Sequence, residues 1–122
     1  MDLYGGTNVR SRENRDQYQQ QWRFIFDPSQ GTYRIENRAI PTYVLTWQAA
    51  QGDNVNVATD NGKPEQYWIV EDAGNGYVYL RNKKDRNKVL DVADSNTANG
   101  TNIRAWDLNG GTNQKFKLNW LS

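Results

Sequence analysis

The sequence predicts an all-β fold made of three repeated units within a single domain of 122 residues. Three segments of the form Gly-x-Asn-aliphatic recur along the chain, and each begins 14 residues before a glutamine that opens a Gln-x-aromatic motif. Five Trp, seven Tyr and three Phe can supply much of the buried area of one small core. The segments are Gly6-Thr7-Asn8-Val9, Gly52-Asp53-Asn54-Val55 and Gly100-Thr101-Asn102-Ile103, and their motifs are Gln20-Gln21-Trp22, Gln66-Tyr67-Trp68 and Gln114-Lys115-Phe116.

Each unit contains short stretches in which apolar residues recur with a period of two, as expected for strands with one buried face. The alternation begins at the Gln-x-aromatic motif, and its members are Trp22, Phe24 and Phe26, then Trp68 and Val70, then Phe116, Leu118 and Trp120. Turn-forming residues at 27–31 and 72–76 precede two matching strands, and a further hairpin partner follows each of them. No segment has the pattern of a helix, so we expect about four short strands in each unit.

Composition excludes several classes of function. The chain has no cysteine and no histidine, so disulfides, thiol nucleophiles, the usual zinc ligands and the commonest general base are absent. We therefore expect no metal site, no cofactor and no enzymatic activity. The formal net charge is +1 with acids and bases interspersed, which argues against a nucleic-acid partner. No apolar run approaches the roughly 20 residues of a membrane-spanning helix, so no membrane insertion is expected, and no export signal is visible.

A candidate binding site lies in the third unit. Binding an uncharged sugar requires groups that hydrogen-bond neighbouring hydroxyls and a flat aromatic surface for the apolar face of the ring. Asp91 would accept from two hydroxyls, and Trp106 would lie beneath the ring. Asn109 and Asn113 would bridge the remaining hydroxyls. We expect Gln114 to brace Asp91 or the loop rather than to contact a ligand strongly.

Each of these residues also has a purely structural interpretation. Asp91 would then accept backbone N–H groups in a tight turn, and Trp106 would be part of the core. Asn109 and Asn113 would be ordinary turn residues, as their composition favours. The Gln-x-aromatic motifs themselves are expected to be structural, with the glutamine ordering a turn and the aromatic ring filling the core.

The other two units serve as internal controls. In the second unit the counterparts of the acid, the aromatic residue and the amide are Thr46, Ala58 and Glu65. In the first unit the counterparts of the aromatic residue and the amide are Arg12 and Gln19, and the position of the acid is predicted to fall in a missing segment. The scaffold does not require the three residues at equivalent positions, which narrows the search to the third unit.

Three four-stranded units that each end in Gln-x-aromatic resemble the ricin B-type β-trefoil lectins and the related carbohydrate-binding modules, over essentially the whole chain. The resemblance implies a β-trefoil fold and non-catalytic binding of galactose-type or xylose-type sugars. In that family the acid of the Leu-Asp-Val motif, an aromatic residue at a strand end and the Asn before Gln-x-Trp bind the sugar, and these match Asp91, Trp106 and Asn113. Asp94 falls on the second loop acid of the family. Arg104 stands where many members have Gln, a change expected to alter the sugar preferred or to favour an acidic sugar.

The chain is also similar to the cysteine-free receptor-binding heads of insecticidal and clostridial toxins. This similarity implies an alternative function, in which the domain targets a receptor or docks a protein within a bacterial toxin complex and the sugar site is vestigial. Both functions place the protein outside the cell, so we expect it to be secreted.

The first unit is shorter than the other two. The units fall at about residues 1–26, 27–70 and 71–122, and only five residues precede Gly6, so the first hairpin of the first unit is predicted to be missing. That count gives ten strands where the family has twelve. A lost hairpin exposes strand edges and aromatic surface. We therefore expect a homo-oligomer, or completion of the fold by another chain or domain.

Two basic stretches and the acids of the chain offer weaker alternatives. Acidic residues interrupt both basic stretches, so a solvated surface explains them better than a nucleic-acid groove does. Nothing in the spacing of the acids singles out a pair for glycoside hydrolysis. The basic residues are Arg10, Arg12 and Arg15 in the first unit and Arg81, Lys83, Lys84, Arg86 and Lys88 in the third.

Overall fold

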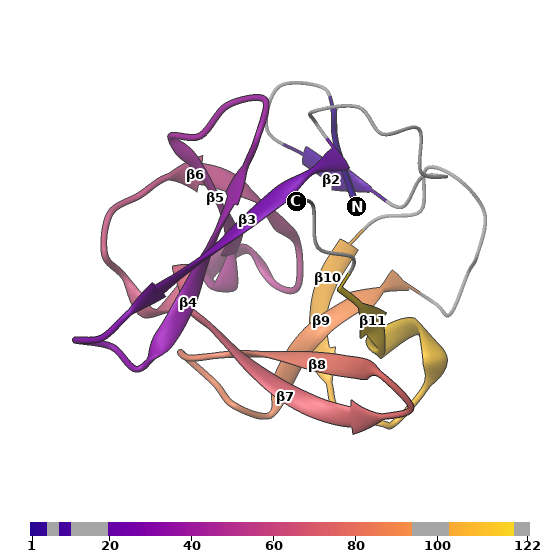
Figure 1. The fold of residues 1–122 in the computed structure, drawn as a ribbon. Helices are drawn as coiled ribbons and strands as arrows, with labels where there is room; N and C mark the ends of the chain where they lie inside the picture. Colours follow the sequence, from indigo (N-terminus) through magenta and orange to yellow (C-terminus); the bar gives the residue numbers. More distant parts are fainter. Residues whose placement is uncertain (5–7, 11–19, 94–102, 119–122) are drawn as a thin grey trace.

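The structure is a computed structural model that describes residues 1–4, 8–10, 20–93 and 103–118 (Figure 1). Eleven strands and three short 3-10 helices make up the described part, and all paired strands are antiparallel. The strands are β1 (Asp2–Tyr4), β2 (Asn8–Arg10), β3 (Trp22–Asp27), β4 (Thr32–Asn37), β5 (Tyr43–Trp47), β6 (Val55–Thr59), β7 (Trp68–Gly74), β8 (Tyr77–Asn82), β9 (Lys88–Val92), β10 (Ile103–Asp107) and β11 (Phe116–Lys117). The helices are η2 (Ala49–Gln51), η3 (Pro64–Gln66) and η5 (Thr112–Gln114).

The second and third units each contain the four strands that the sequence predicts. Strands β3 and β4 pair along their whole length, and β7 pairs with β8 with one register shift between Asp72 and Gly74. Figure 1 shows both pairs as long twisted ribbons. Strand β5 then pairs with β6, and β9 with β10. The turn between β7 and β8 holds Asn75 and Gly76 at φ 56° and 83°, a left-handed conformation that asparagine and glycine adopt most easily. The same sequence pattern therefore builds the same hairpins twice.

Strand β11 lies on β8 as β7 lies on β4. Phe116 pairs with Val78, and Trp68 pairs with Tyr33, which occupies the matching place in the second unit. The third Gln-x-aromatic motif thus opens a strand that takes the first-strand position of unit one, while β1 and β2 form its last hairpin. The predicted count of ten strands was one too low, because eleven strands lie within the described ranges.

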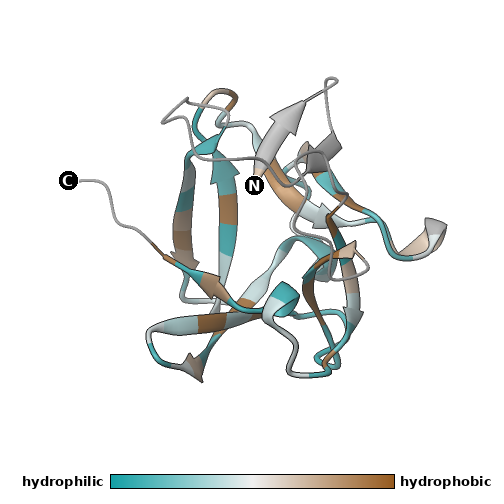
Figure 2. Cartoon of the chain, turned by 90° about the vertical axis from the view of Figure 1, so that its right-hand side faces the viewer, coloured by the Kyte–Doolittle hydropathy of each residue, from teal (hydrophilic) through white to brown (hydrophobic). Residues whose placement is uncertain are grey.

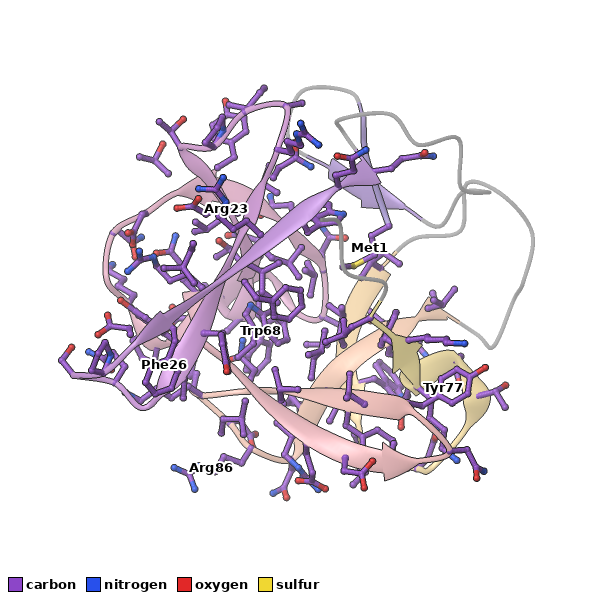
Figure 3. The ribbon with its side chains drawn as sticks, viewed as in Figure 1. Met1, Arg23, Phe26, Trp68, Tyr77 and Arg86 are labelled. Carbon is purple, nitrogen blue, oxygen red and sulfur yellow. The ribbon has the colours of Figure 1, made fainter. Side chains whose placement is uncertain are left out.

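The core is formed where the inward faces of these strands meet. Trp68 is fully buried at its centre, and its indole N–H donates to the Leu45 carbonyl oxygen at 3.1 Å (Figure 3). Apolar and polar positions alternate along the strands in Figure 2, as a period of two requires. The other fully buried apolar residues are aliphatic and come from β4 to β10: Ile35, Val44, Leu45, Val55, Val57, Leu80, Val89, Leu90 and Ile103. Trp47 and Tyr67 are also buried, so the described core combines aliphatic residues with a few large rings.

Most aromatic side chains lie at the rim of the core instead. Trp22, Phe24, Tyr43 and Phe116 are partly buried and pack against the aliphatic centre. An aromatic ring is hard to enclose completely in a domain of this size. Among the described aromatic residues, Trp68 is fully buried, and Trp47 and Tyr67 are nearly so, at 8% and 4% exposed. The aliphatic residues then fill the remaining space at the close packing typical of protein interiors.

The glutamines of the second and third motifs order the loops that follow β6 and β10. Gln66 donates from Nε2 to the Thr59 carbonyl oxygen at 2.9 Å and accepts the Asn61 backbone N–H at 2.8 Å. Gln114 makes the matching bonds to the Asp107 carbonyl oxygen and the Asn109 N–H, at 2.8 and 2.9 Å. Both side chains are fully buried. These contacts confirm the structural role predicted for this glutamine.

Candidate functional site

The centre of the candidate site is an acid–base pair across β9 and β10. Asp91 is opposite Arg104 in the antiparallel register, and Arg104 donates from Nε to Asp91 Oδ1 at 2.9 Å. The Asp91 side chain is 0% exposed, and Arg104 and Gln114 each contact one of its carboxylate oxygens. A buried carboxylate requires partners of this kind, since its loss of hydration is costly.

Gln114 holds the second oxygen of the same carboxylate. Its Nε2 atom donates to Asp91 Oδ2 at 2.9 Å. The same nitrogen also reaches the Asp107 carbonyl oxygen, and the amide oxygen accepts the Asn109 N–H. The side chain of Gln114 therefore links β9, the end of β10 and the loop after it. The sequence predicts that Gln114 braces Asp91 or the loop, and the structure shows hydrogen bonds to both.

Trp106 lies outside the core, at the exposed face of β10. Its side chain is 40% exposed, so the interpretation of this residue as a core aromatic is wrong. The guanidinium carbon of Arg104 lies 3.9 Å from the centroid of the Trp106 ring system. Residues two apart on a strand point to the same face, which places Arg104 and Trp106 side by side. A cation over an indole ring contributes about 0.5–2 kcal/mol.

The loop after Trp106 brings two asparagine side chains together around Gly111. Asn109 Oδ1 accepts the Gly111 backbone N–H at 2.8 Å, and Asn113 Nδ2 donates to the Val92 carbonyl oxygen at 3.2 Å. A Cβ atom at Gly111 would lie 2.5 Å from Asn113 Oδ1 and 3.0 Å from Asn109 Oδ1. The absence of a side chain at Gly111 therefore allows both amide oxygens to approach. Both asparagines have turn-stabilising bonds, as their structural interpretation predicts.

The structure brings together five of the six predicted site residues. Asp91, Gln114 and Asn109 belong to one hydrogen-bonded network, and Asn113 bonds the carbonyl oxygen of Val92, the residue after Asp91. Trp106 joins the network through Arg104. Asp94 lies outside the described residues. The exposed surface of the cluster is formed by Trp106 and the loop after it, because Asp91 is fully buried.

The second unit contains the same bracing without the acid or the aromatic residue. Thr46 is opposite Asn56 as Asp91 is opposite Arg104, and Ala58 occupies the register position of Trp106. Gln66 Nε2 lies 3.3 Å from Thr46 Oγ1, at the place where Gln114 meets Asp91. The predicted equivalence of these positions is therefore confirmed, and an uncharged pair is sufficient for the fold.

Comparison with protein families identifies the scaffold. Residues 18–106 match the family described as ricin-type beta-trefoil lectin domain-like. The chain belongs to this family of lectin domains. The match covers most of the chain and includes the second unit and the part of the third unit that carries Asp91 and Trp106.

Similar proteins agree with the assignment of this lectin domain. The main hemagglutinin component type C of Clostridium botulinum C phage is 30% identical over 109 residues, which are 87% of this chain and 37% of that protein. A mosquitocidal holotoxin superimposes with a TM-score of 0.87 at 33% identity, over 93% of this chain and 15% of that chain. The designed three-fold symmetric protein ThreeFoil gives a TM-score of 0.85 at 29% identity, over 93% of this chain and 81% of that chain. The β-trefoil fold and the similarity to toxin-associated trefoils are therefore confirmed.

The lectin domain spans little more than a third of the hemagglutinin that it matches. Within the described ranges, no helix is long and apolar enough to cross a membrane. In the same part of the chain, no three His, Cys, Asp or Glu side chains converge in a way that could hold a metal ion.

The first unit of the lectin domain corrects one inference from the sequence. Asp2 is opposite Arg10 in the β1–β2 hairpin, and Leu3 is opposite Val9. This register matches that of Asp91 opposite Arg104. The position of the acid in the first unit is therefore present and occupied by Asp2, and the prediction that it falls in a missing segment was wrong.

The basic hairpin of the third unit is paired with acids. Arg81 donates to both oxygens of Glu71, at 2.5 and 3.1 Å, and these bonds lower the pKa of Glu71. Lys88 Nζ lies 2.7 Å from Asp107 Oδ1. Lys83 lies over the Tyr67 ring, with Nζ 5.8 Å from its centroid. These contacts support the interpretation of the stretch as a solvated surface.

Sequence reasoning gave Arg104 a minor role, although its position between the acid and the aromatic residue is central. Two signals in the sequence predict its place. Arg104 and Trp106 are two residues apart on one strand, which puts them on one face. Arg104 also follows the repeated Gly-x-Asn-aliphatic segment directly, as Asn56 does in the second unit.

Proposed function

We propose that this lectin domain binds carbohydrate without catalysing a reaction, and that it recognises a galactose-type or related sugar through one site in the third unit. The observation that carries the proposal is the exposed Trp106 beside the Asp91–Arg104 pair, on a scaffold whose second unit has Thr46 and Ala58 instead. A feature that the fold does not require is best explained by a ligand.

In this proposal, Trp106 and the side-chain amides of Asn109 and Asn113 form the surface that contacts the sugar. Trp106 offers an apolar face for the sugar ring, and each amide supplies both a donor and an acceptor for hydroxyls. Asp91 and Gln114 hold this surface from below, because both Asp91 oxygens already accept hydrogen bonds. Asp94 would add a second acid from the preceding loop, as the family resemblance implies.

A single site of this kind binds a monosaccharide weakly, with a dissociation constant of the order of millimolar, or about 4 kcal/mol. Multivalency raises the apparent affinity without new contacts. Repeated copies in an oligomer, or fusion to a larger protein, would supply it. Extracellular location follows as part of the proposal, since the glycans that such a domain would bind lie on cell surfaces.

The test uses a glycan array and a galactose column with two matched variants. Trp106→Ala is expected to abolish retention, while Ile40→Ala, which removes an equally exposed apolar side chain between β4 and β5, keeps it. Asp91→Thr, which introduces the residue of the second unit, is expected to weaken binding without unfolding the domain. Retention of Trp106→Ala and Asp91→Thr at the wild-type level would reject the site.

One observation favours a second function. Both Asp91 oxygens are bonded within the protein, which is compatible with a vestigial sugar site on a receptor-targeting or protein-docking module of a toxin complex. The hemagglutinin component and the holotoxin are both much longer than this chain. Pull-down of a partner that free galactose or lactose does not elute would favour this function, and elution by either sugar would count against it.

A further inference from the structure

Arg104 is the charged residue that contacts both Asp91 and Trp106 in the third-unit site. Its side chain is 13% exposed, whereas the Asp91 carboxylate to which it donates is 0% exposed. The Nε atom lies 2.9 Å from Asp91 Oδ1, and the guanidinium carbon lies 3.9 Å from the Trp106 ring centroid. A ligand that reaches Trp106 therefore meets a cation before it meets the acid.

The chemistry of a guanidinium group matches a carboxylate ligand. It presents five N–H donors in a planar fork and has no acceptor, and it can bridge two carboxylates at the same time. Donation from Nε to Asp91 fixes the orientation of the plane, and stacking on Trp106 fixes it from a second direction. A guanidinium held in this way loses little conformational freedom when an anion binds, which favours binding.

The second unit has no cation at the position of Arg104. Asn56 occupies the position of Arg104 in the second unit, where it accepts the Gln48 amide at 2.8 Å and faces Thr46 across the strands. No charge is present in that pair, although the strand register and the glutamine bracing are the same. In the first unit, by contrast, Asp2 is opposite Arg10, so the fold accepts either a charged or an uncharged pair at this place.

Neighbouring charges do not oppose an anionic ligand strongly. The acid next to Trp106 in the chain is Asp107, and its carboxylate lies 2.7 Å from Lys88 Nζ. Asp91 is neutralised by Arg104 itself. The charges described around Trp106 therefore consist of two acid–base pairs.

Building on the proposed lectin function, we propose that Arg104 determines specificity and that the preferred ligand is a saccharide bearing a carboxylate. The ring of the saccharide would lie against the surface around Trp106, and its carboxylate would pair with the Arg104 guanidinium. Asp91 is then a positioning residue that acts through Arg104. A hexuronic acid and a sialic acid share this chemistry.

The decisive experiment compares two ligands that differ only at carbon 6, methyl galactopyranoside and methyl galactopyranosiduronate, by calorimetric titration of the whole chain. The uronate is expected to bind about tenfold more tightly at low salt, as a charge-assisted bond implies. That advantage should shrink when about 0.5 M sodium chloride is added. N-acetylneuraminic acid in a third titration distinguishes a sialic acid from a hexuronic acid as the source of the carboxylate.

Two variants separate specificity from folding. Arg104→Gln is expected to lose the preference for the uronate while it still binds the neutral galactoside. The double change Asp91→Thr with Arg104→Asn copies the uncharged pair of the second unit, so it should stay folded in thermal denaturation and should also lose the preference.

The outcomes distinguish this inference from the lectin function on which it rests. If the neutral galactoside binds as well as the uronate, or if Arg104→Gln weakens both ligands equally, Arg104 does not determine specificity and the lectin function stands. If neither galactoside nor either acid binds at millimolar concentration, both proposals are wrong.

Discussion

Gln114 Nε2 donates to Asp91 Oδ2 at 2.9 Å, although the two residues are 23 positions apart in the chain. This contact lies in the third-unit site, which also contains Trp106, the only exposed tryptophan within the described ranges. At the equivalent place in the second unit, Gln66 Nε2 donates to Thr46 Oγ1 at 3.3 Å. The glutamine thus has one structural task in both units, and in the third unit it additionally fixes a buried carboxylate. The third-unit site therefore uses the same glutamine contact as the second unit, with Asp91 in place of Thr46.

Replacement of Gln114 by methionine keeps the volume of the side chain and removes its hydrogen bonds. The Asp91 carboxylate, the Asp107 carbonyl oxygen and the Asn109 N–H each lose a partner, so the free energy of unfolding should fall by about 2–4 kcal/mol. Gln66→Met is the matched control and should cost less, because its third partner is a hydroxyl rather than a carboxylate. Urea denaturation measures both. Equal losses would show that the carboxylate contact adds nothing to stability.

Introduction of a methyl group at Gly111 tests the two asparagines. Gly111→Ala places Cβ within 2.5 Å of Asn113 Oδ1, so the amide must move, whereas the backbone at φ −71° accepts alanine without strain. We expect sugar affinity to fall several-fold and stability to fall by no more than about 1 kcal/mol. Lys63→Ala at the equivalent position of η3 is the control and should leave affinity unchanged. Titration with methyl galactoside checks this, and unchanged affinity in Gly111→Ala would remove the asparagines from the site.

The Glu71–Arg81 pair predicts a small dependence of stability on pH. Hydrogen bonds from Arg81 lower the pKa of Glu71 below its ordinary value of 4.5. A carboxyl group with a lowered folded pKa stabilises the protein above its unfolded pKa, and this contribution is lost as the pH falls through the folded value. Because Glu71 is 44% exposed, Glu71→Gln should cost less than about 1 kcal/mol at neutral pH. Denaturation from pH 7 to pH 3 should show the difference disappearing, and a difference that grows in acid would contradict the assignment.

Self-association is proposed from the apolar surface around the β3–β4 hairpin. Phe26 is 51% exposed at the end of β3 and contacts Tyr33 edge-on, and Figure 3 places it at the periphery of the molecule. Exposed aromatic surface of this kind favours association. We expect light scattering at micromolar concentration to report an oligomer and Phe26→Ser to reduce it. A purely monomeric wild-type protein would contradict the proposal.

Most of this fold can be predicted from the sequence, because the fixed spacing within the repeat shows which positions of the units are equivalent. The spacing from each glycine to each glutamine locates the loop after the fourth strand, and Gln66 and Gln114 make the same bonds there. The alternation that begins at Phe116 also indicates a strand where β11 lies, but the count of ten strands leaves this strand out. The alternating pattern also cannot show that aliphatic residues fill the centre and that most aromatic rings lie at its edge, since this depends on how the units meet.

The candidate site was predicted less completely. The sequence predicts that Asp91, Trp106, Asn113 and Gln114 lie close together, and they do. It does not predict that Asp91 is fully buried. Burial depends on what covers a side chain from another strand. Here the cover comes from Arg104 and Gln114, whose contacts with Asp91 lie across the sheet and along a loop.

The central claim is that one site, around Trp106, binds sugar. The most direct measurement is a titration of the isotopically labelled chain with methyl galactopyranoside and methyl galactopyranosiduronate, followed by NMR through the indole N–H signals of the tryptophans. The account predicts that the Trp106 signal shifts in a saturable way while the signal of the buried Trp68 stays in place. Saturable shifts at tryptophans other than Trp106, with Trp106 unmoved, or no saturable shift with either sugar at millimolar concentration, would contradict it.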